Sequence, residues 1–134
     1  MTDSASVAAL ADRAGDVSIV INNAGVGGTG PLLSTGINDI RATFETNLFG
    51  AIRVAQAFAP TLARNGGGAL VDIHSALSWI AGGGAYGASK AAFWSATNSL
   101  RLELAAQDTL VVADQKAALE APYAPAPAIQ LSAE

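Results

Sequence analysis

The chain has 134 residues, of which 51% are apolar and 13% charged, with a net charge of −4, one histidine and no cysteine. This length suits one domain with a buried core, and the composition excludes a disordered chain. The negative net charge opposes binding to nucleic acid, and a single histidine without cysteine cannot build a zinc cluster. We therefore expect neither a nucleic-acid partner nor a metal site.

The order of the predicted elements indicates an α/β fold. Asp3 or Ser4 can cap a first helix that runs to about Ala14. Continuous apolar, β-branched runs are typical of parallel strands covered by helices. Such runs and the helical patterns between them predict a parallel sheet of about three strands. The predicted strands are 17–22, 69–73 and 109–112, and the predicted long helices are 37–63 and 85–106.

Right-handed crossovers place the connecting helices of such a sheet mainly on one face. The other face, and the sheet edge at residues 18–21, are then expected to be open to the tail, a second copy or a further segment. Residues 114–120 are compatible with a short helix, and the following alanines and prolines have no core periodicity. We therefore place the domain at residues 1–113 and an irregular or weakly helical tail at 114–134.

Three glycines after the first strand superficially match a dinucleotide-binding fingerprint. Gly25, Gly27 and Gly30 have the spacing G-x-G-x-x-G. In the working motif the third glycine lies in a helix, whereas here Pro31 follows it and the helical pattern begins only near Ile37. This context favours a flexible glycine loop.

A hydrolytic triad is not expected from Asp72, His74 and Ser75. Neighbouring side chains in a strand point to opposite faces, and the chain has no G-x-S-x-G motif. We expect His74 to be a strand-end residue with a satisfied hydrogen bond.

The spacing of Tyr86 and Lys90 places a phenol and an ammonium on one helix face. A cation beside a phenol favours the phenolate, which suits a general acid or base, although such pairs also line ordinary helix surfaces. Ser75 is expected at the carboxyl end of its strand, close to the start of the helix that carries Tyr86, where ligands bind in open α/β folds. Asn47 lies within a helical pattern, where asparagine is unfavourable without a local bond or a function.

Four features in this order resemble the short-chain dehydrogenase/reductase family, classical type. They are Asn-Asn-Ala-Gly after a strand, an asparagine in a long helix, a serine at the end of the next strand, and Tyr-x-x-x-Lys opening the next helix. The resemblance covers about residues 2–112. It implies a partial Rossmann-like sheet, NAD(P) as cofactor, and reversible hydride transfer to or from a small-molecule carbonyl or secondary alcohol.

The resemblance also implies a role for each site residue. Tyr86 would be the catalytic acid or base, and Lys90 would favour its phenolate and hold the nicotinamide ribose. Ser75 would polarise the substrate oxygen, and Asn47 would position a water that relays protons through Lys90. The implied cofactor-binding residues are Asn23, Ala24, Gly25, Tyr86 and Lys90, and no metal ligand is implied.

The chain departs from the family pattern at both ends. Family members begin with a strand and a glycine-rich turn for the pyrophosphate, and a Pro-Gly turn, a helix and a strand follow the position of Val112; neither part occurs here. We therefore expect an oxidoreductase of little activity. The alternative is a non-catalytic truncated remnant or an oligomerisation module that associates, as a homo-oligomer, through the open sheet face and the long helices.

The first residues lack the basic and apolar parts of a signal peptide, and no apolar run has the length of a membrane span. We expect a cytoplasmic protein without a membrane partner.

Overall fold

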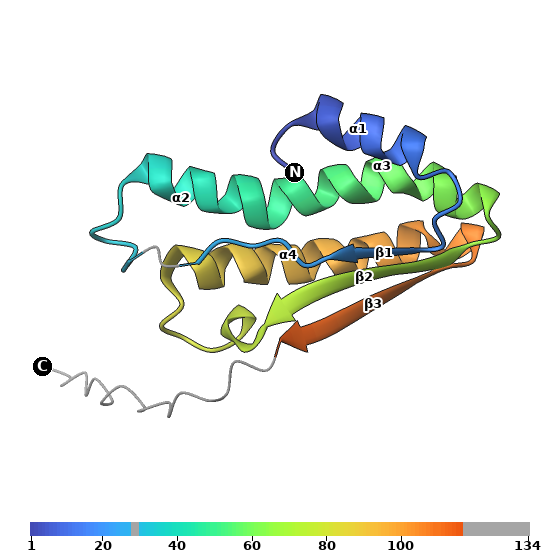
Figure 1. The fold of residues 1–134 in the computed structure, drawn as a ribbon. Coiled ribbons are helices and arrows are strands. Elements are labelled where there is room, and N and C mark those ends of the chain that lie inside the picture. Colours follow the sequence, from blue (N-terminus) through green and yellow to red (C-terminus); the bar gives the residue numbers. More distant parts are fainter. Residues whose placement is uncertain (28–29, 117–134) are drawn as a thin grey trace, which may run out of the picture.

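The computed structural model describes residues 1–27 and 30–116. In this part of the chain three parallel strands form one sheet in the order β1-β2-β3, and helices pack against it (Figure 1). The α/β class and the three-stranded parallel sheet predicted from the sequence are confirmed. The strands are β1 (Ile19–Asn22), β2 (Gly68–Ser75) and β3 (Thr109–Lys116), and the α-helices are α1 (Ser4–Arg13), α2 (Ile37–Phe44), α3 (Gly50–Arg64) and α4 (Gly84–Glu103).

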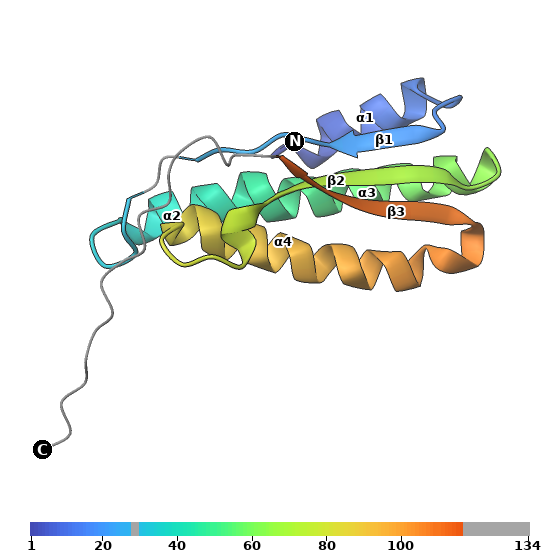
Figure 2. The same cartoon turned by 90° about the horizontal axis from the view of Figure 1, so that it is seen from below.

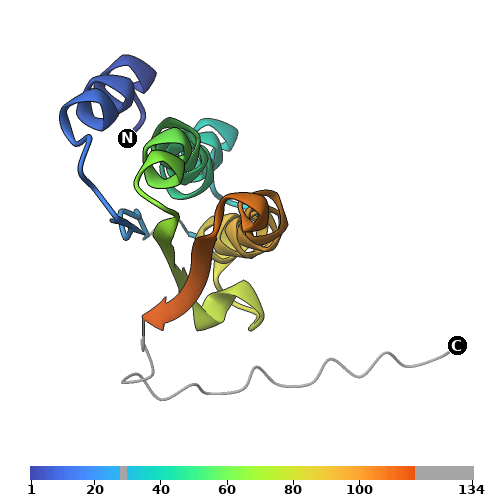
Figure 3. The ribbon, with the colours of Figure 1, turned by 90° about the vertical axis from the view of Figure 1, so that its right-hand side faces the viewer.

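The helices lie on one face of the sheet, as the crossover rule predicts. Figure 3 shows α1, α3 and α4 on the same side, and in Figure 2 the strands lie in front of α3 and α4. On the opposite face Ile19 pairs in register with Ala69, which pairs with Leu110. Ile19, Ile21 and Leu110 are 59%, 61% and 63% exposed. Within the described residues this face is apolar and has no covering helix.

The core lies between the sheet and the helices. Val20, Leu70 and Val111 are adjacent in the sheet register and point into it. They pack with Phe58 and Leu62 of α3, and Leu62 and Leu70 are each 1% exposed. Because side chains alternate along a strand, Val20, Leu70 and Val111 face the core. Ile19, Ile21 and Leu110, which are next to them in the sequence, lie on the open face.

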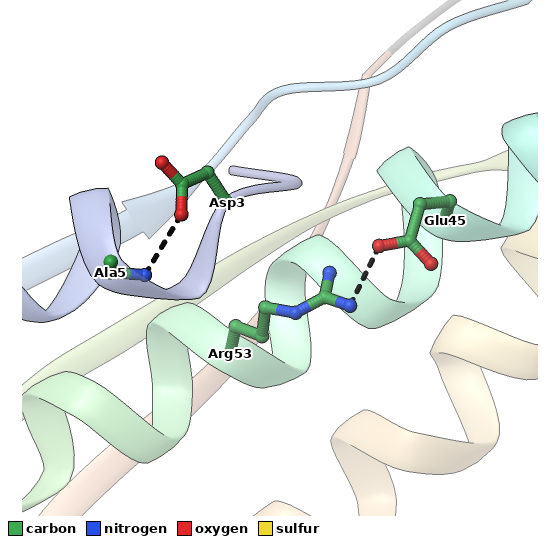
Figure 4. A network of polar contacts seen from close by, with 4 residues as sticks. All are labelled: Asp3, Ala5, Glu45 and Arg53. Carbon is green, nitrogen blue, oxygen red and sulfur yellow. Dashed lines mark hydrogen bonds and ion pairs between the residues drawn. The ribbon is translucent and has the colours of Figure 1, made fainter.

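The long helix predicted over 37–63 contains a π-helical turn, η1 (Glu45–Phe49), between α2 and α3. An ion pair of 2.6 Å between Glu45 and Arg53 joins this turn to α3 (Figure 4). The same view shows the predicted cap of α1, in which Asp3 Oδ1 accepts a hydrogen bond of 3.0 Å from the backbone N–H of Ala5. Such π-turns insert one residue into a helix and frequently occur at functional sites.

The segment after Val112 differs from the prediction. Residues 114–116 continue β3 instead of starting a helix, and the ladder with β2 runs to the pair Ser75 and Lys116. The neighbouring strand supplies backbone partners that the local sequence does not reveal. The rest of the predicted tail, 117–134, lies outside the described residues. In the described ranges no helix has both the length and the apolar character needed to cross a membrane.

Candidate active site

The candidate site lies at the carboxyl edge of the sheet. β1 ends at Asn22 and β2 at Ser75, and α4 begins at Gly84, two residues before Tyr86. Residues 23–27 follow β1 as an exposed segment. Ligands of open parallel sheets bind at this edge.

Asn47 ties the segment after β1 to the helices. It lies in η1 and is 1% exposed. Its Oδ1 accepts from the backbone N–H of Val26 at 2.7 Å, and its Nδ2 donates to the Val26 carbonyl and to Ser89 Oγ, each at 2.9 Å. The amide oxygen and both amide N–H groups thus have protein partners, so its role with a relay water stays a prediction.

Ser89 connects this clamp to the predicted acid or base. Its Oγ donates to the backbone carbonyl of Tyr86 at 2.8 Å while it accepts from Asn47. Tyr86 itself is half-buried in the first turn of α4. The contact chain from Val26 through Asn47 and Ser89 therefore fixes the position of the helix start relative to β1.

Lys90 follows one turn later with a buried ammonium. It is 4% exposed, and its Nζ donates to the carbonyl of Ile73 in β2 at 2.7 Å. The ammonium also lies 5.4 Å from the ring centroid of Phe93. Burial lowers the pKa of Lys90, and the charge of Asp72 opposes this effect.

Two glycines bring the backbone after β1 close to these side chains. A methyl group on Gly25 would lie 3.4 Å from Asn47 Oδ1 and 3.6 Å from Lys90 Nζ, and one on Gly27 would lie 3.7 Å from the Tyr86 ring. The lack of side chains at these two positions therefore lets the backbone after β1 pack closely against the ammonium and the ring. A protonated donor beside exposed glycine backbone is suited to the hydroxyl groups of a nucleotide sugar.

The glycine spacing after β1 does not build a phosphate-binding helix start. Pro31 follows Gly30, and α2 begins at Ile37. The fingerprint requires a helix that starts at the glycines, so its N–H groups point at the phosphates. The observed order agrees with the predicted glycine loop.

Ser75 lies at the end of β2, at the same edge of the sheet, and its hydroxyl has a local partner. It is 4% exposed, and its Oγ accepts from the backbone N–H of Leu77 at 3.2 Å, which caps the short 3₁₀ turn Ala76–Ser78. Within residues 1–27 and 30–116 no hydrogen bond joins Ser75 to Tyr86. Because the hydroxyl accepts this bond, its O–H group can still donate, and its contact with a substrate oxygen stays a prediction.

A buried polar network beneath the site was not predicted. Asp72 accepts from Asn22 Nδ2 at 2.9 Å and from Thr97 Oγ1 at 2.7 Å, and Thr97 Oγ1 lies 3.1 Å from His74 Nε2. These residues come from β1, β2 and α4 and are at most 2% exposed. His74 thus has the hydrogen bond predicted for it on one nitrogen, while its buried Nδ1 has no partner among the described residues. It faces Thr97 rather than Ser75, which excludes a triad with that serine.

His74 is expected to make the protein sensitive to acid. Burial, with the charges of Lys90 and Arg101, lowers its pKa from 6.5 to about 4. A depressed pKa in the folded state gives stability that is present above pH 6.5 and is lost as the pH falls toward 4. The shift corresponds to about 3 kcal/mol in the free energy of unfolding. Urea unfolding over a pH series measures this loss.

The control for this prediction is His74→Gln, whose amide can still donate to Thr97. Asp72 acts in the opposite direction, because burial raises its pKa and protonation in acid favours the fold. The difference between the two unfolding curves isolates His74. Equal acid sensitivity in both proteins would contradict the prediction.

Comparisons with known proteins agree with this geometry. The family model described as short chain dehydrogenase matches residues 1–122. The chain is 41% identical over 113 residues to 1-deoxy-11-beta-hydroxypentalenate dehydrogenase of Streptomyces avermitilis, covering 78% of this chain and 42% of that protein. It is 38% identical over 93 residues to an NADPH-dependent 1-acyldihydroxyacetone phosphate reductase of Schizosaccharomyces pombe, covering 68% and 31%.

Solved structures give the same result. A short chain dehydrogenase from Burkholderia cenocepacia in complex with NADP superposes with a TM-score of 0.79 at 36% identity, covering 84% of this chain and 48% of that one. A metagenomic short-chain oxidoreductase in complex with NADP also gives 0.79, at 27% identity, with 88% and 57% covered. The chain spans less than half the length of these two curated relatives.

Proposed function

This chain belongs to the short-chain dehydrogenase family, and from that premise we propose that its site transfers hydride between NAD(P)H and a carbonyl compound or secondary alcohol. The observation that carries the proposal is the placement of Tyr86 and Lys90 one turn apart at the start of α4, with the backbone of Gly25 and Gly27 lying against their side chains. The relatives' names support a reduction or oxidation at carbon, and the matched structures contain NADP.

In this proposal the residues of the chain handle the proton. Tyr86 gives a proton to the substrate oxygen or takes one from it, and the ammonium of Lys90 stabilises the phenolate. Ser75 donates a hydrogen bond to the same oxygen. Asn47 holds the segment after β1 in place through its two bonds to Val26.

The dinucleotide, when bound, supplies or accepts the hydride. Lys90 and the exposed backbone of Asn23, Ala24 and Gly25 would hold its sugar hydroxyls. The glycines after β1 do not lead into a helix start that could bind the pyrophosphate, because Pro31 follows Gly30 and α2 begins at Ile37. We therefore propose that the 134-residue polypeptide alone binds the cofactor weakly, and because a misplacement of about 1 Å can cost on the order of 100-fold in rate, that it turns over slowly.

Fluorescence titration with NADPH tests the proposed cofactor site. The wild-type chain is expected to show weak, saturable binding, and Lys90→Met is expected to weaken it roughly 10- to 100-fold, the effect of losing hydrogen bonds from a charged donor. Arg13→Met is the matched control, because it removes the same charge from an exposed residue of α1 that precedes β1.

Equal losses in the two variants would contradict a specific role for Lys90. A dissociation constant in the low micromolar range for the wild-type chain would contradict the expected weak binding. Neither measurement depends on knowing the substrate.

A further inference from the structure

Among the residues that the structure describes, the buried ammonium of Lys90 has no direct ion pair. Its close contacts are the Ile73 carbonyl and the ring of Phe93. Glu45 forms its ion pair with Arg53 and not with Lys90. A buried ammonium loses its hydration and tends to release its proton unless a nearby negative charge compensates.

Asp72 is the acid placed to compensate this charge. It is 0% exposed and directly precedes Ile73, the residue that accepts the hydrogen bond of Lys90. Lys90 and Thr97 lie two turns apart on one face of α4, and both contact this part of β2, Lys90 at Ile73 and Thr97 at Asp72. Asp72 and the ammonium therefore lie on the same buried interface between β2 and α4.

The partners of Asp72 favour its ionised form. Asn22 Nδ2 and Thr97 Oγ1 both donate to it, one to each carboxylate oxygen. Burial raises the pKa of Asp72, whereas these two bonds and the charges of Lys90 and Arg101 lower it. The ionised form of Asp72 is thus stabilised by its two hydrogen-bond donors and by the charge of Lys90. In turn, the carboxylate stabilises the protonated form of Lys90.

The other charged and titratable groups that act on this interface do not replace Asp72. His74 is buried with a pKa of about 4, so it is neutral at neutral pH. Arg101 is exposed, and its guanidinium donates to the Val111 carbonyl and to Asn98. Neither of these two supplies a negative charge, and the acidic residue Asp114, which pairs in register with Ile73, is exposed on β3.

We propose that Asp72 is the counter-charge of Lys90, a positioning residue that keeps the lysine protonated in its buried place without touching it. This inference rests on the proposed function, which gives the lysine charge its use toward Tyr86. Loss of the carboxylate would move the deprotonation of Lys90, and with it the alkaline limit of any turnover, to lower pH.

The test measures the titration of Lys90 directly, by NMR of carbon-13 at the lysine Cε. The sequence has two lysines, Lys90 and Lys116, so the spectrum has two signals, and Lys116→Arg identifies the signal of Lys90. In Asp72→Asn the amide keeps the shape and can still bond Asn22 and Thr97. We expect the Lys90 midpoint to shift to lower pH in this variant.

Asp12→Asn is the control, because it removes an equal charge from an exposed position on α1. An unmoved Lys90 midpoint in Asp72→Asn, or an equal shift in Asp12→Asn, would overturn the proposal. Since the readout needs no turnover, a chain without hydride-transfer activity still gives a decisive result.

A second measurement covers the case in which Asp72→Asn does not fold. His74→Gln removes the other buried group at this interface that takes up a proton in acid, so Asp72 remains. In this variant the Lys90 signal is expected to show an inflection at acidic pH, where the Asp72 carboxylate becomes protonated. A flat signal through the acid range would show that the carboxylate carries no charge felt by Lys90, which overturns the proposal.

Discussion

Replacing Tyr86 by phenylalanine is expected to lower turnover by roughly 100- to 10,000-fold, the contribution of a positioned general acid or base. The variant keeps the ring beside Gly27 and the backbone carbonyl that accepts from Ser89. It removes only the hydroxyl that would exchange the proton. The fold and the affinity for NADPH should therefore stay close to those of the wild type.

The measurement is the change in NADPH absorbance with a panel of ketones, or its formation from secondary alcohols. Because slow turnover is expected of the isolated chain, the ratio of variant to wild type is the relevant quantity. Tyr123→Phe makes the same chemical change at the other tyrosine of the sequence and serves as control. Turnover that survives in Tyr86→Phe, or falls equally in the control, would contradict the role of Tyr86.

The fold was predictable where local pattern and topology agree. The three apolar runs predict a parallel sheet, and the right-handed crossover rule predicts helices mainly on one face; the order β1-β2-β3 comes from the structure. The end of β3 was not predictable, because residues 113–116 gain their strand structure from backbone pairing with β2 rather than from apolar side chains. The π-turn at Glu45–Phe49 likewise has no local sequence signal.

The site likewise has residues that the sequence predicts and contacts that it does not. Tyr86 and Lys90 are recognisable because their spacing in the sequence matches one helical turn. The contacts of Asn47 with Val26 and Ser89, and those of Asp72 with Asn22 and Thr97, join residues 21 to 50 positions apart. Such bonds depend on which elements pack together. The one available signal was Asp72, a charged residue within the apolar run of β2.

Gly67→Ala is expected to lower the free energy of unfolding by roughly 4 kcal/mol or more, from backbone strain together with a clash that no rotamer relieves. Gly67 has φ +104°, and an added Cβ would overlap the backbone carbonyl of Asp108, the residue before β3. Gly68, with φ +81°, meets the backbone carbonyl of Ser18 just before β1. Urea unfolding followed by circular dichroism measures the loss for both variants.

Gly66→Ala separates the two causes, because Gly66 also has positive φ, +86°, but open space around its Cβ position. It should cost only about 1 kcal/mol, the strain of a side chain in this conformation. A similar loss in all three variants would mean that strain alone acts at this turn. The glycines lie at the amino edge of the sheet, where β2 is fitted between the starts of β1 and β3, whereas Tyr86 and Lys90 lie toward the carboxyl edge. Any loss of activity in Gly67→Ala should therefore be proportional to the fraction of protein that is unfolded. The loss of activity in Tyr86→Phe should occur in protein that remains folded.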